Sequence, residues 1–457
     1  MVNALGDKKG TSERLNWLSE CYIQLIIANA VILGLSFLDS QLDYFSWVMV
    51  LIAIVGSANC IIVMGRNHCP VANPVSIYIM IWLVLVPLTS FEAPLMPAMT
   101  FFEWQMCSTF GIVYCLAGLI VTAKVHQAPS SISHRVAISS QLETVLLGLI
   151  AISIVALIVN FSIGGIALFS VDEMERKTQS AFIGYPLLSS IGSVGVALLA
   201  NCYELKHKKL YFVLSFAFLL LQILTGTRFV AIVTMLMLGA IFASYRLGKR
   251  QRRAIIVGAV LLVLIFSFVS AYRNGLEHME TYYISTGLYQ GSASELTSTE
   301  IIRYFGIDQR NMSTVISREF DPQDFLEYSL SPLTSISGED LGGLGTSYYG
   351  YTANNIIAYA YHDAGLGMWL LLFVWSAAVQ ISYMQFIQCR SSLIRSYWWA
   401  TMAMSLAMSF FAYFNAYAYW MLVFPIVVSL LQLVCSKPGQ SHISAEKHQR
   451  SHVEVVS

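Results

Sequence analysis

The sequence predicts an all-α polytopic membrane protein with about 12 transmembrane helices, on the strength of its composition and its hydropathy. Of the 457 residues, 56% are hydrophobic and only 11% are charged, whereas an average soluble domain carries roughly 25% charged residues. Apolar stretches of about 20 residues recur along the whole chain, and a helix of that length crosses a ~30 Å hydrocarbon core. Too few charges remain to cover a water-facing surface, so an ordinary soluble enzyme is excluded.

Twelve ranges of the chain have the length and hydropathy of a transmembrane helix. The first is too long for the apolar region of a signal peptide and lacks a small-residue cleavage site, so we expect a mature helix there. The twelve ranges are 17 to 37, 45 to 64, 74 to 91, 104 to 123, 142 to 161, 184 to 203, 209 to 225, 227 to 245, 254 to 271, 365 to 386, 396 to 414 and 417 to 435.

The positions of the basic residues predict the orientation of these helices. Lys and Arg are retained on the cytoplasmic side of a membrane, and with the N-terminus inside, 19 of the 26 Lys and Arg residues fall in inner segments. Both termini are then cytoplasmic. The predicted parts are residues 1–271 with nine spans and a short outer loop at 162–183, a large periplasmic loop at 272–350, residues 351–435 with three spans, and a disordered cytoplasmic tail at 436–457.

Charge and cysteine usage exclude several other classes of protein. Lys plus Arg and Asp plus Glu both number 26, so no net charge favours nucleic acid as a partner. None of the eight cysteines lies in a long outer loop, and a disulfide framework is not expected. The chain has no CxxC, HExxH or other His/Cys cluster of metal-ligand spacing, so we expect no protein-built metal site and no cofactor.

The large loop at 272–350 is the predicted location of the working site, because a long loop in a compact protein is more often functional than idle. Its acidic excess also follows from the topology rule alone, since exported loops are depleted in Lys and Arg. The kind of cation is more informative, because six of the seven basic residues assigned outside are arginine. Arginine presents a rigid fork that fits phosphate and carboxylate oxygens, which predicts an anionic ligand at the outer surface.

The tetrapeptide Thr225-Gly226-Thr227-Arg228 divides the apolar run 209 to 245 into two short helices. A hairpin there places Arg228 at the outer start of the second helix, where unpaired N–H groups, a cap from Thr225 or Thr227 and the guanidinium form an anion site. The alternative is an arginine that extends from a turn to lipid headgroups. An ionisable group so close to hydrocarbon is costly unless it is used, which favours a functional role.

Five further outer arginines are candidates for anion binding. Arg273 follows the ninth span directly, as membrane-anchoring arginines also do. Arg176, in the short outer loop, could equally pair with its acidic neighbours on a helix. The other three are spaced by seven and eight residues and would align on one face of a helix over 296–320, as they would on a solvated helix face. They are Arg303, Arg310 and Arg318, which we expect to bind substrate.

A segment rich in tyrosine and asparagine ends the large loop and leads into the tenth span. Such side chains suit hydrogen bonding to sugar hydroxyls and stacking on pyranose rings, and they suit equally an interfacial helix with an aromatic belt. The glycine-rich stretch at its start follows no predicted strand, so a nucleotide-binding loop is excluded. The candidate substrate-binding residues are Tyr348, Tyr349, Tyr351 and Asn354.

In architecture and short motifs the chain resembles the bacterial O-antigen polymerase family of oligosaccharide repeat-unit polymerases. It has ten or more predicted spans and one dominant outer loop. The short motifs are Gly164 and Gly165 in the shorter outer loop, the Thr225-to-Arg228 turn opening a helix, and a helix beginning Gly365-x-Gly367. The architecture carries more of this match than any single motif.

The resemblance implies a lipid-linked glycosyltransferase of the membrane-embedded class called GT-C, located in a bacterial inner membrane. Its substrates would be undecaprenyl-pyrophosphate-linked oligosaccharides in the lipid bilayer, with a chain-length regulator as a further partner. Arg176, Arg228 and Arg273 would bind and neutralise the leaving pyrophosphate, so that a metal is not required.

A base must also take the proton from the acceptor hydroxyl in such a reaction. We favour His362 with Asp363, because a neutral histidine near pH 7 is a ready base and the pair lies where the loop rejoins the membrane. Other residues qualify by side chain and by side of the membrane. They are Glu277, His278, Glu280, Asp321 and Asp324.

Two other functions fit parts of the pattern. An O-antigen ligase uses the same donor and fold with a lipopolysaccharide core as acceptor. A transporter for lipid-linked sugars would favour inverted repeats and ionisable residues near the membrane midplane, and this sequence displays neither feature plainly.

Overall fold

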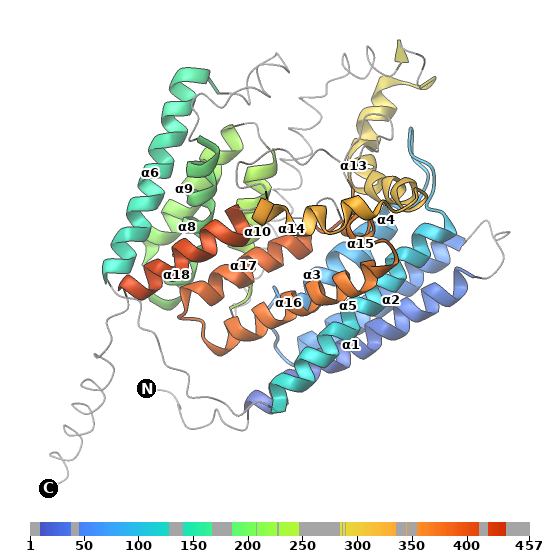
Figure 1. Cartoon of the computed structure of the whole chain (residues 1–457), viewed down its shortest axis with the longest axis horizontal. Coiled ribbons are helices and arrows are strands. Elements are labelled where there is room, and N and C mark those ends of the chain that lie inside the picture. Colours follow the sequence, from blue (N-terminus) through green and yellow to red (C-terminus); the bar gives the residue numbers. More distant parts are fainter. Residues whose placement is uncertain are drawn as a thin grey trace, which may run out of the picture.

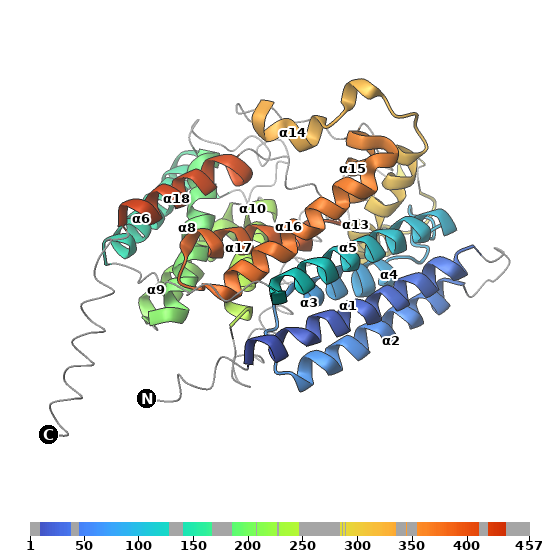
Figure 2. The same ribbon diagram turned by 60° about the horizontal axis from the view of Figure 1, so that its bottom comes forward.

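The computed structural model describes residues 10–37, 45–127, 140–166, 185–206, 208–225, 228–245, 284–334 without 286 and 288, 344, 354–410 and 419–435. Within these ranges every regular element is a helix (Figures 1 and 2). Among the described residues, six stretches are long and apolar enough to cross a membrane. They are Asn16–Leu35, Ser46–Arg66, Phe101–Lys124, Ser140–Gly164, Leu187–Lys206 and Ile356–Gln388. The predicted all-α membrane class is confirmed for this part of the chain.

The helices follow the predicted spans closely. Among the described residues, eleven of the twelve predicted ranges overlap helices, and the range 254 to 271 lies outside the described residues. In chain order the elements are α1 (Gly10–Leu35), α2 (Phe45–Arg66), α3 (Pro74–Tyr78), a π-helix (Ile79–Leu85), α4 (Val86–Leu88), α5 (Phe101–Gln127), α6 (Ser140–Gly164), α8 (Tyr185–Lys206), α9 (Lys209–Leu224), α10 (Arg228–Ala243), α13 (Ala293–Ile316), a 3-10 helix (Pro322–Asp324), α14 (Glu327–Thr334), α15 (Ile356–Ala364), a 3-10 helix (Gly365–Gly367), α16 (Met368–Gln388), α17 (Leu393–Met408), a π-helix (Tyr419–Val423) and α18 (Phe424–Cys435).

Helices α1, α5 and α16 form the core of one half of the bundle. Near one end, Gln105 of α5 donates to the carbonyl oxygen of Ser36 at 3.2 Å. Further along, Gly118 of α5 lies against the ring of Tyr22, and the Tyr22 hydroxyl donates to Oε1 of Gln380 on α16. The small glycine allows the close approach of the two helices, and the contacts show that α1 and α5 are antiparallel.

Helices α6, α8 and α9 pack together in the other half. Ser153 of α6 donates to the carbonyl oxygen of Leu188 at 2.8 Å. Toward the other end of α6, the buried carboxylate of Glu143 accepts from Lys208 at 2.7 Å and also binds Lys206 and the Tyr211 hydroxyl. The contacts make α6 and α8 antiparallel and bring two lysines to the end of the bundle where α6 begins.

The contacts sort the helix termini into two ends of the bundle. Trp399, in the first half of α17, donates to Oγ of Ser244 at 2.7 Å, just beyond the last residue of α10. At the other end of α17, Ser409 accepts the N–H of Ile356, the first residue of α15, at 2.7 Å. The start of α10 and the start of α15 therefore lie at one end, which we call the loop end. These contacts give the relative directions of α10, α15 and α17, and the side of the membrane that each end faces stays a prediction.

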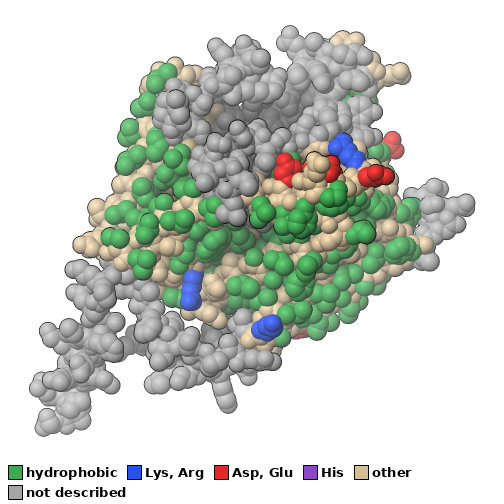
Figure 3. Space-filling view, in the orientation of Figure 1, with side chains coloured by type: hydrophobic (Ala, Val, Ile, Leu, Met, Phe, Trp, Pro, Cys, Tyr) green, Lys and Arg blue, Asp and Glu red, His purple; other side chains and the backbone are tan. Residues whose placement is uncertain are grey.

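The sides of the bundle are apolar. Leu51, Ile163 and Leu370 are 61%, 64% and 70% exposed, and hydrophobic side chains cover much of the face drawn in Figure 3, while the acidic side chains in that view lie toward its top. Large aliphatic residues so fully exposed on long helices are suited to contact lipid.

Helices α13, α14 and α15 lie at the loop end (Figures 1 and 2). Two of them, α13 and α14, come from the predicted loop at 272–350, so part of that loop is helical. The Asn355 amide nitrogen lies 3.4 Å from the sulfur of Met312, and α15 packs against α13 through this contact. This arrangement positions the ionisable residues of the candidate site.

Candidate functional site

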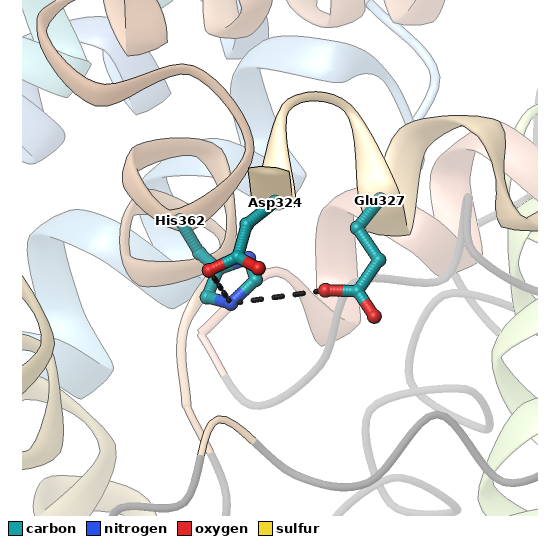
Figure 4. Close-up of side chains that lie close together, drawn as sticks. All are labelled: Asp324, Glu327 and His362. Carbon is teal, nitrogen blue, oxygen red and sulfur yellow. Dashed lines mark ion pairs between the residues drawn. The ribbon is translucent and has the colours of Figure 1, made fainter. Parts of the chain in front are cut away.

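A histidine and two carboxylates meet at the loop end (Figure 4). The Nε2 atom of His362 on α15 lies 3.4 Å from Oδ2 of Asp324 and 3.9 Å from Oε2 of Glu327. One ligand atom from each residue lies within 4.8 Å of the others. The side chains of His362, Asp324 and Glu327 are 21%, 39% and 49% exposed. This group, the His362 cluster, is therefore open to solvent on its carboxylate side.

Helix α15 carries His362 in its last turn. The helix begins after Asn355, whose side-chain oxygen accepts two backbone N–H groups of the first turn that the helix itself leaves unpaired. It ends at Gly365, which has φ +52° and where a Cβ would lie 3.0 Å from the Phe320 ring. Glycine adopts this conformation at little cost. The break therefore places His362 in the last turn of a short helix, before α16 begins.

A sharp turn directs the two carboxylates toward α15. Leu326, between Asp324 and Glu327, has φ +59°, which is uncommon for leucine. Its N–H donates to the backbone carbonyl of Asp363 at 2.9 Å. This hydrogen bond holds the turn against α15. Asp324, before the turn, and Glu327, after it, therefore both lie near His362.

Asp363 joins α15 to the start of α14. The residue is fully buried, and its carboxylate accepts the N–H of Tyr328 at 2.9 Å, the N–H of Ser329 at 2.7 Å and the Ser329 hydroxyl at 2.5 Å. A carboxylate at a helix N-terminus satisfies unpaired N–H groups and interacts favourably with the helix dipole. In the structure the buried oxygens of Asp363 bind the start of α14 and hold that helix in place. Its expected role as a base with His362 stays a prediction.

Three carboxylates raise the pKa of the His362 imidazole above its ordinary value of 6.5. Asp363 is the largest cause, Asp324 and Glu327 add to it, and partial burial opposes it. Oδ1 of Asp363 lies 3.8 Å from Nδ1, which is too long for a hydrogen bond, so Asp363 acts through its charge. The raised pKa shifts the imidazole toward its protonated form relative to an ordinary histidine, whereas the sequence argument assumed a neutral imidazole.

The predicted hairpin at Thr225 to Arg228 joins α9 to α10. Thr225 ends α9, and its hydroxyl donates to the carbonyl oxygen of Gln222 at 2.6 Å. Arg228 is the first residue of α10, as predicted. Thr227, the other predicted capping residue, lies outside the described residues.

A buried polar network holds this hairpin against α8. Gln222 donates to Oγ of Ser193 at 2.9 Å, and the Thr234 hydroxyl lies within hydrogen-bond distance of two acceptors, the same Ser193 oxygen at 2.7 Å and Oε1 of Gln222. All three residues are fully buried. In hydrocarbon such groups have no water to bind, so their mutual hydrogen bonds fix where α9 ends and where α10 begins with Arg228.

Two predicted substrate-binding arginines are buried at the loop end. Helix α13 places Arg303 and Arg310 two turns apart, and they are 1% and 3% exposed. Arg310 donates to the carbonyl oxygens of Thr89 and Pro97, both at 3.0 Å, and Arg303 donates to a carbonyl of its own helix at 2.6 Å. The Arg310 bonds, together with a bond from Arg303 to the carbonyl oxygen of Pro94 at 3.4 Å, anchor α13 to the segment between α4 and α5. In the structure both residues therefore hold α13 in place, and the expected contact with substrate stays a prediction.

Arg318 lies just beyond α13 and is exposed. Its guanidinium donates to the carbonyl oxygen of Leu344 at 2.9 Å, and its own carbonyl accepts the Tyr361 hydroxyl at 3.0 Å. Because Tyr361 precedes His362, the structure brings this arginine into the neighbourhood of the His362 cluster.

The remaining predicted site residues are buried, act as caps or fall outside the described ranges. Asn354 is fully buried beside the N-cap of α15. Asp321 accepts the N–H of Gln323 at 2.9 Å and caps the 3-10 helix. The residues outside the described ranges are Arg176, Arg273, Glu277, His278, Glu280, Tyr348, Tyr349 and Tyr351.

Sequence reasoning missed Glu327 and the grouping of the His362 cluster. Asp324 and Glu327 are three residues apart, and this spacing of two acids before a helix was the only available signal. His362 lies on a different helix, so no short motif joins it to them.

Comparison of the chain with protein-family models, with curated proteins and with solved structures finds no match. The fold and the site define the protein as a multi-pass helical membrane protein with an ionisable cluster at one end of its bundle.

Proposed function

We propose that this protein polymerises undecaprenyl-pyrophosphate-linked oligosaccharide repeat units into O-antigen or a related surface polysaccharide. The observation that carries the proposal is that Arg228, at the start of α10, and the His362 cluster lie at the same end of an apolar bundle. A helix start with an arginine suits a lipid pyrophosphate, and an acid–base group at the same level suits a sugar acceptor. The resemblance to the O-antigen polymerase family supports the same function.

The proposed location is the inner membrane of a bacterium, with both termini cytoplasmic and the loop end facing outward. The charge rule supports this orientation, because Lys206 and Lys208 lie at the opposite end of the bundle from the His362 cluster. The GT-C class belongs to the same proposal and is supported by the family resemblance.

In the proposed reaction, a sugar hydroxyl of the acceptor attacks the anomeric carbon that joins the donor chain to its carrier. The bond from that carbon to the pyrophosphate oxygen breaks as the glycosidic bond forms, and undecaprenyl pyrophosphate leaves with the electron pair. The hydroxyl proton passes to the His362 cluster, whose exposed carboxylates, Asp324 and Glu327, accept it. Arg228, together with Arg176 and Arg273, neutralises the leaving pyrophosphate.

A deletion strain tests the function through its lipopolysaccharide pattern. Loss of a polymerase leaves cores that carry one repeat unit or none, and the ladder of longer products disappears. Bare cores with long chains accumulating on the lipid carrier would identify a ligase instead. Single lipid-linked units trapped on the cytoplasmic face would identify a transporter.

Substitution of Arg228 tests the anion site. Lysine keeps the charge and loses the planar fork, so Arg228→Lys should lower polymer yield at least tenfold while the protein level in the membrane stays constant. Arg395→Lys, at the opposite end of the bundle, is the matched control and should leave the yield unchanged. Near-normal polymer from Arg228→Ala would remove this residue from the mechanism.

A further inference from the structure

The three side chains of the His362 cluster face one another at separations that suit ligands of one cation. Nε2 of His362 lies 3.4 Å from Oδ2 of Asp324, and all three ligand atoms lie within 4.8 Å of one another. Ligands held at 2.0–2.2 Å from a metal are roughly 3.0–3.4 Å apart. The separation of 3.9 Å between Nε2 and the Glu327 carboxylate closes to this range by rotation of one exposed side chain.

The same separations are long for direct hydrogen bonds. The donor and acceptor atoms of good hydrogen bonds lie 2.7–3.2 Å apart, whereas Nε2 is 3.4 Å and 3.9 Å from the two carboxylates. The imidazole is therefore aimed between the carboxylates without being bonded to either. A cation between the three groups would satisfy all of them at once.

The charges behind the imidazole complete a site of this kind. A histidine that binds a metal through one ring nitrogen usually has a carboxylate or carbonyl near the other, which orients the ring. Asp363 occupies that position, with Oδ1 3.8 Å from Nδ1. Its own oxygens are held by the backbone of α14, so its position is fixed by the fold.

We propose that Asp324, Glu327 and His362 form a binding site for one first-row divalent cation, such as Mn²⁺ or Zn²⁺. One imidazole nitrogen with two carboxylate oxygens suits these ions better than Mg²⁺ or Ca²⁺, which favour oxygen ligands alone. The carboxylates are 39% and 49% exposed, so the remaining coordination positions face the solution. They can take an oxygen of a phosphate or a sugar hydroxyl.

The effect of the cation on the reaction rests on the proposed function. A cation at Nε2 would polarise the acceptor hydroxyl and so assist transfer of its proton to an oxygen of Asp324 or Glu327 that does not bind the ion. This differs from the metal-free mechanism expected from the sequence. The binding site itself is inferred from geometry alone. Its test therefore measures binding and does not require activity.

Titration of the full-length, tag-free protein in detergent with Mn²⁺ tests the proposal. The protein is first stripped with a chelator and desalted, and free Mn²⁺ is then followed by its electron paramagnetic resonance signal, which broadens on binding. We expect saturable binding of about one ion per chain. Asp324→Asn, Glu327→Gln and His362→Gln should each weaken the affinity at least tenfold.

The matched control is Glu319→Gln, because Glu319 is an exposed acidic residue on the same segment, outside the cluster. It should bind Mn²⁺ like the parent protein. Thermal unfolding is the second measurement, since an ion that binds only the folded state raises the melting temperature. The increase should occur in the parent and in Glu319→Gln and disappear in the three cluster variants, whose own melting curves report whether they are folded.

Absence of saturable binding in the parent protein, or equal affinity in the parent and the cluster variants, would overturn the proposal. Saturable binding of Mn²⁺ would support the site whether or not the protein restores the polymer in a deletion strain. A polymerase without bound Mn²⁺ would retain the proposed function and lose the cation site, so the two proposals fail separately.

Discussion

At the scale of single residues, burial decides what the charged groups at the loop end do. Asp363 and Asp308 are both fully buried aspartates. Asp363 accepts backbone and hydroxyl hydrogen bonds at the start of α14, whereas neither carboxyl oxygen of Asp308 has a hydrogen-bond partner. A buried carboxylate is stable only where bonds replace those to water, so the two residues should respond differently to substitution.

Asp363→Asn should loosen the segment 321–334. An amide nitrogen would face a backbone N–H in place of a carboxylate oxygen, and an unsatisfied buried group costs about 1–3 kcal/mol. Limited proteolysis should cut this segment faster, and the melting temperature should fall. Asp321→Asn is the control, because asparagine is an equally good helix cap at that exposed position. Equal proteolysis of the two variants would contradict the role assigned to Asp363.

Asp308→Asn should stabilise the protein at neutral pH. Burial raises the pKa of Asp308 well above its usual value, so the folded state retains a proton that the unfolded state releases above its lower pKa. The stability that protonated Asp308 confers at acidic pH is then lost as the pH rises from about 4, the pKa in the unfolded state, toward the higher pKa in the folded state. Asparagine has no such proton, so its advantage in melting temperature should be large at pH 8 and vanish near pH 4. A pH-independent difference would refute this account.

At the scale of helices, glycine permits the contact between α1 and α5. A Cβ at Gly118 would lie 2.6 Å from the buried ring of Tyr22, while a Cβ at Gly148 on α6 would meet no atom within 4 Å. Alanine in place of glycine stabilises a free helix by about 1 kcal/mol. Packing therefore decides the sign of the effect.

Gly118→Ala should destabilise the protein by roughly 1–3 kcal/mol, the usual range for overpacking, whereas Gly148→Ala should be neutral or stabilising. Thermal unfolding of the two variants in the same detergent measures the difference. If both variants melt at or above the temperature of the parent, α1 and α5 do not pack as closely as described.

At the scale of the whole molecule, the helix directions place all the described termini at two ends. The loop end carries α13, α14 and α15, and the other end carries the Lys206 and Lys208 pair with Glu143. The charge rule assigns the lysine end to the cytoplasm. Labelling of single cysteines can test this assignment directly.

Cysteines introduced at Ser294 and Gln323, both exposed at the loop end, should react with an impermeant thiol reagent in intact spheroplasts. A cysteine at Asn67, exposed in the turn after α2 at the other end, should react only after permeabilisation. The parent protein measures the background from its native cysteines. The reverse labelling pattern would invert the orientation and place the His362 cluster in the cytoplasm.

The sequence by itself determined the class of the protein and the positions of most helices. Hydropathy over about 20 residues is a local property, so it locates the apolar helices, and Thr225 to Arg228 interrupts one such run visibly enough to predict the hairpin between α9 and α10. The sequence also predicts that a helix begins at Arg228, because turn residues between two apolar runs mark a helix boundary without any contact from distant segments.

Only the tertiary structure decided which charged residues are available for chemistry. Arg310 donates to a carbonyl oxygen that is 221 positions away in sequence. Asp363 accepts a backbone N–H of α14 that is 35 positions away. His362 meets Asp324 and Glu327 because a glycine ends α15 and a turn at Leu326 folds back onto it. Burial and pairing depend on contacts between distant segments, and no residue type or spacing encodes them locally.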